Sequence, residues 1–257
     1  MVRVIFVLLP AYNEGKNLKS VLDEIRLVLE SRETDYRVLV INDGSKDETL
    51  RVLKSAAKEI PLEVISFEKN RGVDAVFRKG IDRICQQAGD DDIMISMDCD
   101  RTHKARTFNL LIESLNSGND VAVASRYHEK SLSVNLPFWR AFLSDGINAM
   151  LRLIFPLKGA KDYTTFFRAY RISVLKKALE LYKENFITQK GFSCMAEILI
   201  KLRVFKIRLG EVPIDLRFDL RTGGSKMNIR ETIFGYLLLI CRQLLRRFSG
   251  VFRKADI

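Results

Sequence analysis

The first half of the chain alternates short apolar runs with segments of helical periodicity, and this alternation most constrains the fold. We expect strands at residues 2–9, 36–42, 62–68, 93–98 and 121–125, and helices at residues 16–31, 47–59, 74–87 and 106–116. Such β-α alternation predicts an α/β fold in which a mostly parallel, Rossmann-like sheet carries helices on both faces. Because right-handed crossovers bring the carboxyl ends of parallel strands to one edge, the segments that follow these strands should meet in one cleft.

Two aspartates stand at the carboxyl end of the fourth of these strands. Asp98 and Asp100 follow the apolar run at residues 93–97. Carboxylates two residues apart at a strand end can turn toward one hard cation, and Mg²⁺ or Mn²⁺ is commonly held by one or two carboxylates together with substrate phosphates. An acidic loop that only solvates the end of a strand is the alternative reading of this pattern.

The second half of the chain is less regular. We expect helices at residues 136–155 and 191–205, a strand at 164–170, an extended segment at 211–218, a turn at 223–224 and a final helix at 229–248. The sequence contains no internal repeat, no low-complexity segment and no evident linker. We therefore expect one domain over residues 1–228 and a basic amphipathic helix within residues 229–257.

The charge balance indicates an anionic partner. The 257 residues include 43 Lys and Arg against 32 Asp and Glu, a formal net charge of +11. This excess suits nucleic acid, a nucleotide substrate or an acidic membrane surface. The basic residues are dispersed and do not cluster with aromatic residues, which disfavours nucleic acid. The four cysteines form no CxxC pair and only two histidines are present, so no zinc site is expected.

Neither a signal peptide nor a membrane-spanning helix is expected from the hydropathy pattern. The apolar run that begins at Val4 breaks at Pro10, and no run of about 18 apolar residues occurs.

Nine short motifs occur in an order that is typical of one enzyme family. They are PAYNE (10–14), NDGS (42–45), NRG (70–72), MDCDRTH (97–103), ASRY (124–127), RAFLSDGIN (140–148), FFRAYR (166–171), EVPI (211–214) and GGSKM (223–227). On these motifs the chain resembles family 2 glycosyltransferases of the GT-A fold, specifically the dolichyl-phosphate mannose synthase-like group. The resemblance covers roughly residues 2 to 228.

The resemblance assigns roles to individual positions. It implies donor binding by Pro10, Tyr12, Glu14, Asp43, Gly72, Ser225 and Lys226. It implies binding of the acceptor phosphate by Arg126, Arg140 and Ser144, and the two arginines suit this role because a guanidinium forks onto phosphate oxygens. It implies a Mg²⁺ or Mn²⁺ ion on Asp98 and Asp100, and a catalytic set of Asp98, Asp100, Arg126 and Arg221.

Three positions depart from the group's usual pattern. Thr102, the third metal position that the resemblance implies, stands where the group commonly has glutamine, and a hydroxyl is a shorter and weaker metal ligand than an amide oxygen. Asp74 and Phe166 each stand in place of a glycine, so the donor loop gains a charge and the acceptor channel should be reshaped.

The resemblance implies an inverting, metal-dependent transfer of a hexose onto a polyprenyl or dolichyl monophosphate, with mannose from GDP-mannose as the first expectation. A UDP-sugar donor such as UDP-glucose, or a hydroxyl acceptor, are the alternatives. A hydroxyl acceptor needs a general base, whereas a phosphate is already an oxyanion. The Glu-Asp dipeptide found in related enzymes with hydroxyl acceptors is absent, and Glu197, the remaining candidate base, is expected to be structural or close to the metal.

The final helix suggests contact with a membrane surface. Ile233, Leu237 and Leu244 share one face, and Arg242 and Arg246 are among the surrounding basic residues. A basic amphipathic helix can lie in the membrane interface, although packing on the core is the more common use of such a helix. We expect a peripheral protein on the cytoplasmic face of a membrane, acting alone or with a separate membrane protein.

Overall fold

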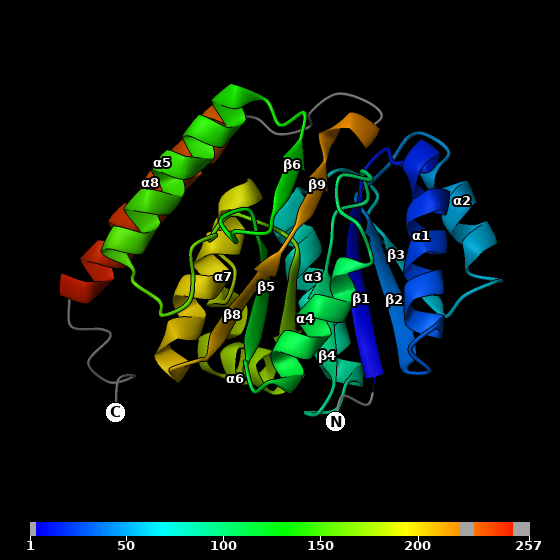
Figure 1. The fold of residues 1–257 in the computed structure, drawn as a ribbon, viewed down its shortest axis with the longest axis horizontal. Coiled ribbons are helices and arrows are strands. Elements are labelled where there is room, and N and C mark those ends of the chain that lie inside the picture. Colours follow the sequence, from blue (N-terminus) through cyan, green and yellow to red (C-terminus); the bar gives the residue numbers. More distant parts are fainter. Residues whose placement is uncertain (1–3, 222–228, 249–257) are drawn as a thin grey trace.

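The computed structural model describes residues 4–221 and 229–248, and its centre is a twisted β-sheet (Figure 1). The strands are β1 (Val4–Ala11), β2 (Asp35–Asn42), β3 (Leu62–Ser66), β4 (Ile93–Ser96), β5 (Val121–Ser125), β7 (Arg168–Arg171) and β8 (Leu209–Pro213). In the described residues they form one sheet of order β3-β2-β1-β4-β7-β5-β8. The strands β6 (Leu132–Val134) and β9 (Asp215–Arg217) pair in parallel as a separate ribbon.

The helices pack on both faces of the sheet. They are α1 (Gly15–Glu30), α2 (Thr49–Ala56), α3 (Val73–Gln87), α4 (Thr107–Asn116), α5 (Phe138–Ile154), α6 (Ile172–Tyr182), α7 (Cys194–Leu202) and α8 (Ile229–Phe248). Side chains of β1 alternate between two cores: Val7 and Leu9 contribute to the core under α1, α2 and α4, whereas Phe6 and Leu8 contribute to the core under α3, α6 and α7. Because both faces are covered, the strand is apolar at successive positions.

The predicted fold class and the five predicted strands of the first half are confirmed. The second half differs in detail. The predicted helix at 191–205 is interrupted, with α7 flanked by 3₁₀ turns at Gly191–Ser193 and Arg203–Phe205. The predicted extended segment at 211–218 contains the end of β8, the whole of β9 and the first residue of a 3₁₀ turn at Phe218–Leu220, and α6 was not predicted. The predicted turn at 223–224 lies outside the described residues.

The strand β7 lies between β4 and β5 and runs in the opposite direction to the other strands of the sheet. It pairs antiparallel with β4 on one side and with β5 on the other. Ser96 at the carboxyl end of β4 faces Arg168 at the amino end of β7. The Ser96 hydroxyl also donates to the Phe166 carbonyl at 2.7 Å. As a result, the segment that leads into β7 enters the edge of the sheet where the parallel strands end.

The helices α5 and α8 pack against each other as a pair at one side of the sheet (Figure 1). Tyr236, Leu239 and Ile240 of α8 are buried, which ties this helix to the body of the protein. Among the described helices, none is long and apolar enough to cross a membrane.

A buried ion pair within α7 also bonds to the loop before this helix. The Lys201 ammonium donates to Glu197 at 2.6 Å, and both side chains are almost fully buried, at 0% and 1% exposed. Glu197 also accepts hydrogen bonds from the Thr188 and Gln189 amides at 2.7 and 2.8 Å. With its oxygens occupied in this way, Glu197 performs a structural role, as the sequence suggested.

Glu197→Ala is therefore expected to lower the free energy of unfolding by about 3–5 kcal/mol, because it leaves the buried Lys201 charge without its partner. Urea denaturation would measure the loss. The Glu197→Met/Lys201→Met double variant, which removes both charges, should recover much of it. Unchanged stability combined with lost enzymatic activity would instead indicate that Glu197 is a catalytic base.

Candidate active site

A cleft of about 1110 Å³ lies at the edge of the sheet where the parallel strands end. Segments that follow the strands line it, as predicted, through Pro10, Tyr12, Glu14, Asp43, Gly72, Asp98, Asp100 and Arg126. The wall provided by α5 carries Trp139, Arg140, Ser144 and Ile147, and the wall provided by α8 carries Glu231, Thr232, Phe234 and Tyr236. The cleft is thus polar at the strand ends, and between the two helices it combines polar groups with an apolar surface formed by Trp139, Leu143, Ile147, Ile233, Phe234 and Leu238.

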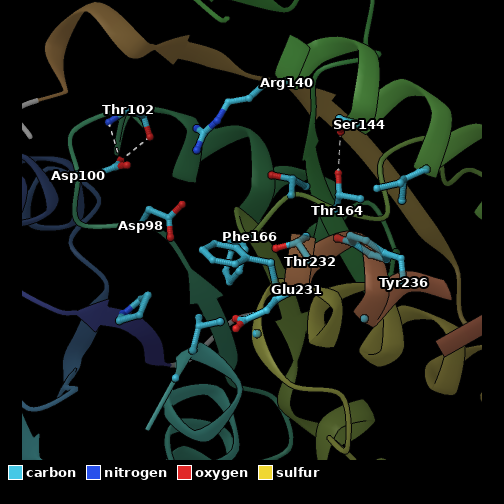
Figure 2. Close-up of a pocket in the computed structure, with 18 of the residues that line it drawn as sticks. Asp98, Asp100, Thr102, Arg140, Ser144, Thr164, Phe166, Glu231, Thr232 and Tyr236 are labelled. Atoms are coloured by element: carbon cyan, nitrogen blue, oxygen red, sulfur yellow. Dashed lines mark hydrogen bonds between the residues drawn. The ribbon is translucent and has the colours of Figure 1, made fainter. Parts of the chain in front are cut away.

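The aspartate pair lies in a tight turn directly after β4. Arg101, between Asp100 and Thr102, has a positive φ of 67°, in the left-handed region. The Asp100 carboxylate accepts a hydrogen bond from the Thr102 amide at 3.1 Å and another from the Thr102 hydroxyl at 2.5 Å (Figure 2). This is an Asx turn, in which a short acidic side chain closes the backbone two residues later. In this structure Thr102 orients Asp100, and its predicted role as a metal ligand stays a prediction.

Two arginines balance the charge of the aspartates. Arg221 Nε lies 3.3 Å from an Asp100 carboxylate oxygen. Arg140 extends from α5 toward the turn (Figure 2), between the rings of Trp139 and Phe218 at 5.4 and 5.6 Å. The pKa of Arg140 is lowered by burial and by the neighbouring Arg221 charge, and Asp100 and Asp98 offset only part of this shift. Arg140 therefore faces the predicted metal site as well as the predicted acceptor site.

The Asp98 carboxyl occupies a strongly unfavourable position for an anion. Burial, followed by the charge of Asp100, raises its pKa to about 8, although Arg221 and Arg140 oppose the shift. His103 supports the same turn, because its Nδ1 accepts a hydrogen bond from the Asp98 amide at 3.3 Å. Burial lowers the pKa of His103 to about 4, so the ring is neutral at physiological pH.

The residues at the turn fit a divalent cation of the Mg²⁺ or Mn²⁺ type. Asp98 and Asp100 offer hard oxygen donors, and burial together with the charge of Asp100 disfavours an unpartnered carboxylate at Asp98, which a bound cation would relieve. Within residues 4–221 and 229–248, no three Asp, Glu, His or Cys side chains gather into a group that could hold a metal ion alone. An ion on the two aspartates would therefore need further oxygen donors, and the oxygens of a diphosphate are of that kind.

Asp43 shapes the donor side of the cleft through the backbone. Its two carboxylate oxygens accept hydrogen bonds from the amides of Arg71 and Gly72 at 2.7 and 3.0 Å. Gly72 has a positive φ of 91° at the start of α3, a conformation that favours glycine. Asp74, which the sequence placed near the donor, instead accepts from the Gly191 amide at 2.9 Å and pairs with Arg78 at 3.0 Å.

The predicted acceptor residues also lie in the cleft. The Arg126 guanidinium donates to the Ser144 hydroxyl at 2.6 Å, and Arg140 lines the same wall one turn earlier on α5. Phe166 packs between Phe77 and Phe192, with ring centroids at 5.4 and 5.2 Å, and so fills space in the floor that a glycine would leave open. The predicted donor residues Ser225 and Lys226 lie outside the described residues.

Several lining residues were not identified from the sequence. They come from the segment before β7, from the loop before α7 and from the first turns of α8, and include Thr164, Thr165, Gln189, Lys190, Glu231, Thr232 and Tyr236. The quoted motif FFRAYR marked the first of these segments, but nothing in its pattern indicated that the residues just before it face the cleft.

Comparison with known proteins identifies the family. The model of the family described as "Glycosyl transferase family 2" matches residues 6–179, which is more than half of the chain. The chain belongs to glycosyl transferase family 2. This confirms the resemblance noted from the motifs, and the matched segment contains the aspartate pair and the predicted acceptor residues.

Two family relatives are similar over almost the whole chain. A dolichol-phosphate mannosyltransferase from Pyrococcus furiosus is 30% identical over 245 residues, which are 95% of this chain and 64% of the relative. The chain thus spans less than two thirds of the length of that protein. A polyprenol monophosphomannose synthase from Mycolicibacterium smegmatis is 28% identical over 252 residues, which are 96% of this chain and 91% of the relative.

A solved structure shares the fold. Glucosyl-3-phosphoglycerate synthase from Mycobacterium tuberculosis, crystallised with Mn²⁺, UDP-glucose and phosphoglyceric acid, aligns with a TM-score of 0.66 at 18% identity. The alignment covers 95% of this chain and 79% of that chain. At this identity the likeness supports the fold assignment alone.

The raised pKa of Asp98 links metal binding to pH. With a pKa of about 8, the carboxyl holds a proton at pH 7, and a cation must displace that proton in order to bind. The affinity for Mn²⁺ should therefore rise about tenfold per pH unit between pH 6 and 8 and level off above that range. Electron paramagnetic resonance of free Mn²⁺ would measure it. Asp98→Asn should bind weakly at every pH, and a flat profile for the unaltered protein would contradict the assignment.

Proposed function

We propose that this chain is an inverting, metal-dependent glycosyltransferase that moves a hexose from a nucleotide sugar onto a polyprenyl monophosphate. The observation that carries the proposal is that one cleft combines an aspartate pair for a metal–diphosphate with a second cationic group, Arg126, beside an apolar wall. A lipid phosphate requires a cationic group for its phosphate and an adjacent apolar surface for its hydrocarbon chain. The names of the P. furiosus and M. smegmatis relatives support a lipid phosphate acceptor.

The roles of the residues follow from charge. Asp98 and Asp100 would hold Mg²⁺ or Mn²⁺, which supplies electrostatic stabilisation for a leaving nucleoside diphosphate. Arg221 and Arg140 face the same point and can neutralise charge on the diphosphate as the sugar–oxygen bond breaks. Arg126 and Ser144 would hold the acceptor phosphate. Its oxygen attacks the anomeric carbon from the face opposite the diphosphate, so the configuration is inverted.

The acceptor oxygen requires no general base. A phosphate is ionised at neutral pH, and the bonding electron pair of the broken bond leaves with the diphosphate, which needs no proton from the enzyme. Glu197 does not line the cleft and has its oxygens occupied. A phosphate acceptor is therefore favoured over a hydroxyl acceptor.

The donor is proposed as GDP-mannose because both similar relatives are named for mannose transfer. UDP-glucose is the second candidate, because the motifs that carry the family resemblance do not determine the sugar or the base. The two donors differ in base and in sugar, and a panel assay distinguishes them.

The test is transfer of radiolabel from GDP-mannose, UDP-glucose and related donors into the organic phase, with and without Mn²⁺ and a short polyprenyl monophosphate. Label should enter only when metal and lipid are both present. Asp100→Asn, which keeps a hydrogen-bonding group but loses the charge, should reduce transfer at least about 100-fold. Asp90→Asn, at an exposed ion pair with Lys176, is the matched control and should leave transfer unchanged. Absence of transfer from every donor would reject the proposed function.

The paired helices extend the proposal to a membrane surface. Exposed apolar side chains occur on both: Phe138, Trp139, Phe142 and Leu153 on α5, and Phe234, Leu237 and Leu245 on α8. Phe138 and Phe142 are 84% and 68% exposed and lie one turn apart beside the cleft-lining residues Trp139 and Leu143. We propose that this face contacts the cytoplasmic surface of the membrane that holds the acceptor.

Phe138→Ser/Phe142→Ser should weaken binding to anionic vesicles at least about tenfold, because two large apolar groups no longer enter the interface. Flotation of the protein with vesicles of mixed neutral and anionic phospholipids measures this. Leu27→Ser is the matched control, because Leu27 is also exposed, at 65%, but lies on α1. Equal flotation of the double variant and the unaltered protein would contradict the membrane proposal. Truncation of α8 is unsuitable, because it would expose the core around Tyr236 and Leu239.

A further inference from the structure

Arg126 is held in place by protein contacts on one edge of its guanidinium. Its Nε and Nη2 donate to the two carboxylate oxygens of Asp162, at 3.1 and 3.3 Å. The Asp162 side chain is fully buried, at 0% exposed, whereas that of Arg126 is 17% exposed and reaches the cleft. A two-point contact of this kind fixes both the position and the plane of a guanidinium.

Hydroxyl groups on either side complete the anchoring. Arg126 Nη2 also donates to the Ser144 hydroxyl at 2.6 Å and to the Thr164 hydroxyl at 3.0 Å. Within the described part of the chain, hydrogen bonds engage Nε and Nη2 of Arg126 and leave Nη1 to the cleft. The fork that the sequence assigned to the acceptor phosphate is therefore already used by Asp162.

Asp162 is itself rigidly placed. One of its oxygens accepts from the Thr164 amide and hydroxyl at 3.1 and 3.0 Å and from the Thr165 amide at 3.1 Å. Its own amide donates to a Glu211 carboxylate oxygen on β8 at 2.8 Å. Burial alone would raise the pKa of Asp162, but the charge of Arg126 and these hydrogen bonds hold it below its ordinary value.

We propose that Asp162 is the positioning residue of the acceptor site, which fixes Arg126 so that its Nη1 edge meets the acceptor phosphate. This rests on the proposed function, in which Arg126 binds that phosphate. Asp162 does not touch the acceptor. It acts by restricting the conformations of a long side chain before binding. An unanchored arginine would lose this conformational entropy each time the phosphate binds.

The chain provides a direct reporter for this site. Trp139 is the single tryptophan of the sequence, lies in the cleft wall and contacts the Arg140 guanidinium. Its fluorescence should change when a short polyprenyl monophosphate binds, so acceptor affinity is measurable without catalysis. Binding of GDP or UDP with Mn²⁺, measured by calorimetry, gives the donor affinity separately.

Asp162→Asn keeps the size of the side chain and removes its charge. We expect it to weaken binding of the polyprenyl monophosphate about 10- to 100-fold and to change nucleotide binding less than about twofold. Arg126→Gln should cause a similar loss. Because Asp162 acts through Arg126, the Asp162→Asn/Arg126→Gln double variant should bind the acceptor no worse than Arg126→Gln alone.

Two further variants separate positioning from charge and from folding. Asp145→Asn removes a nearby carboxylate that bonds the Tyr127 hydroxyl at 2.7 Å but makes no hydrogen bond to Arg126, so acceptor binding should change less than about threefold. Arg126→Lys keeps the positive charge, but an ammonium group cannot bind Asp162 at two points and present a further N–H to the phosphate in a fixed direction. It should therefore lose about as much acceptor affinity as Arg126→Gln. This variant tests the proposal even if Asp162→Asn does not fold.

The outcomes are distinguishable. Acceptor binding by Asp162→Asn or by Arg126→Lys at the level of the unaltered protein would overturn the positioning role while leaving the proposed function intact. Equal losses from Asp162→Asn in the presence and absence of Arg126 would also overturn it. If the unaltered protein binds nucleotide but not polyprenyl monophosphate, both the acceptor assignment and the role of Asp162 are rejected.

Discussion

The parallel pairing of β1 with β2 and β4 is the constraint on which the site depends. Ala11 pairs with Asn42, and Leu8 with Ser96, so the three strands end close together at one edge of the sheet. Residues at or just after their carboxyl ends, from Pro10 to Asp100, are thereby brought into one cleft. The hydrogen bonds of the sheet thus assemble donor and metal positions that are almost 90 residues apart.

The sequence predicted this part of the protein well because the rule behind it is general. Strand periodicity located the β-strands, and the preference for right-handed crossovers then determined which of their ends meet. Asp98 and Asp100 could be identified because a buried strand delivers them. The role of Asp43 was predicted only in part, because its side chain also accepts a hydrogen bond from the Gly72 amide. A contact between two loops that are distant in the sequence cannot be read from the local sequence pattern.

The remainder of the site could not be predicted, because one of its walls follows from an antiparallel strand in an otherwise parallel sheet. Since β7 runs antiparallel, its preceding segment, and not the following one, reaches the edge with the ligand site. Thr164 and Thr165 reach the cleft in this way, and Asp162 is buried directly behind it. The contribution of α8 could not be predicted either. Its pattern of polar and apolar residues identifies an amphipathic helix, but it does not indicate that Thr232 and Tyr236 line the cleft. The departure at Phe166 was visible, whereas its packing against Phe77 was not.

The contact between Arg221 and Asp100 has a consequence for the integrity of the fold. In small zinc domains the metal supplies the cross-link that holds the chain together, and chelation unfolds them. Here the carboxylate has a cationic partner within the chain itself, at 3.3 Å, while the turn around it is closed by Thr102 and His103. The architecture of the cleft is therefore independent of the ion. If the proposed ion binds there, a chelator should remove it without lowering the melting temperature of the protein, so that occupancy of the metal site and thermal stability would vary independently.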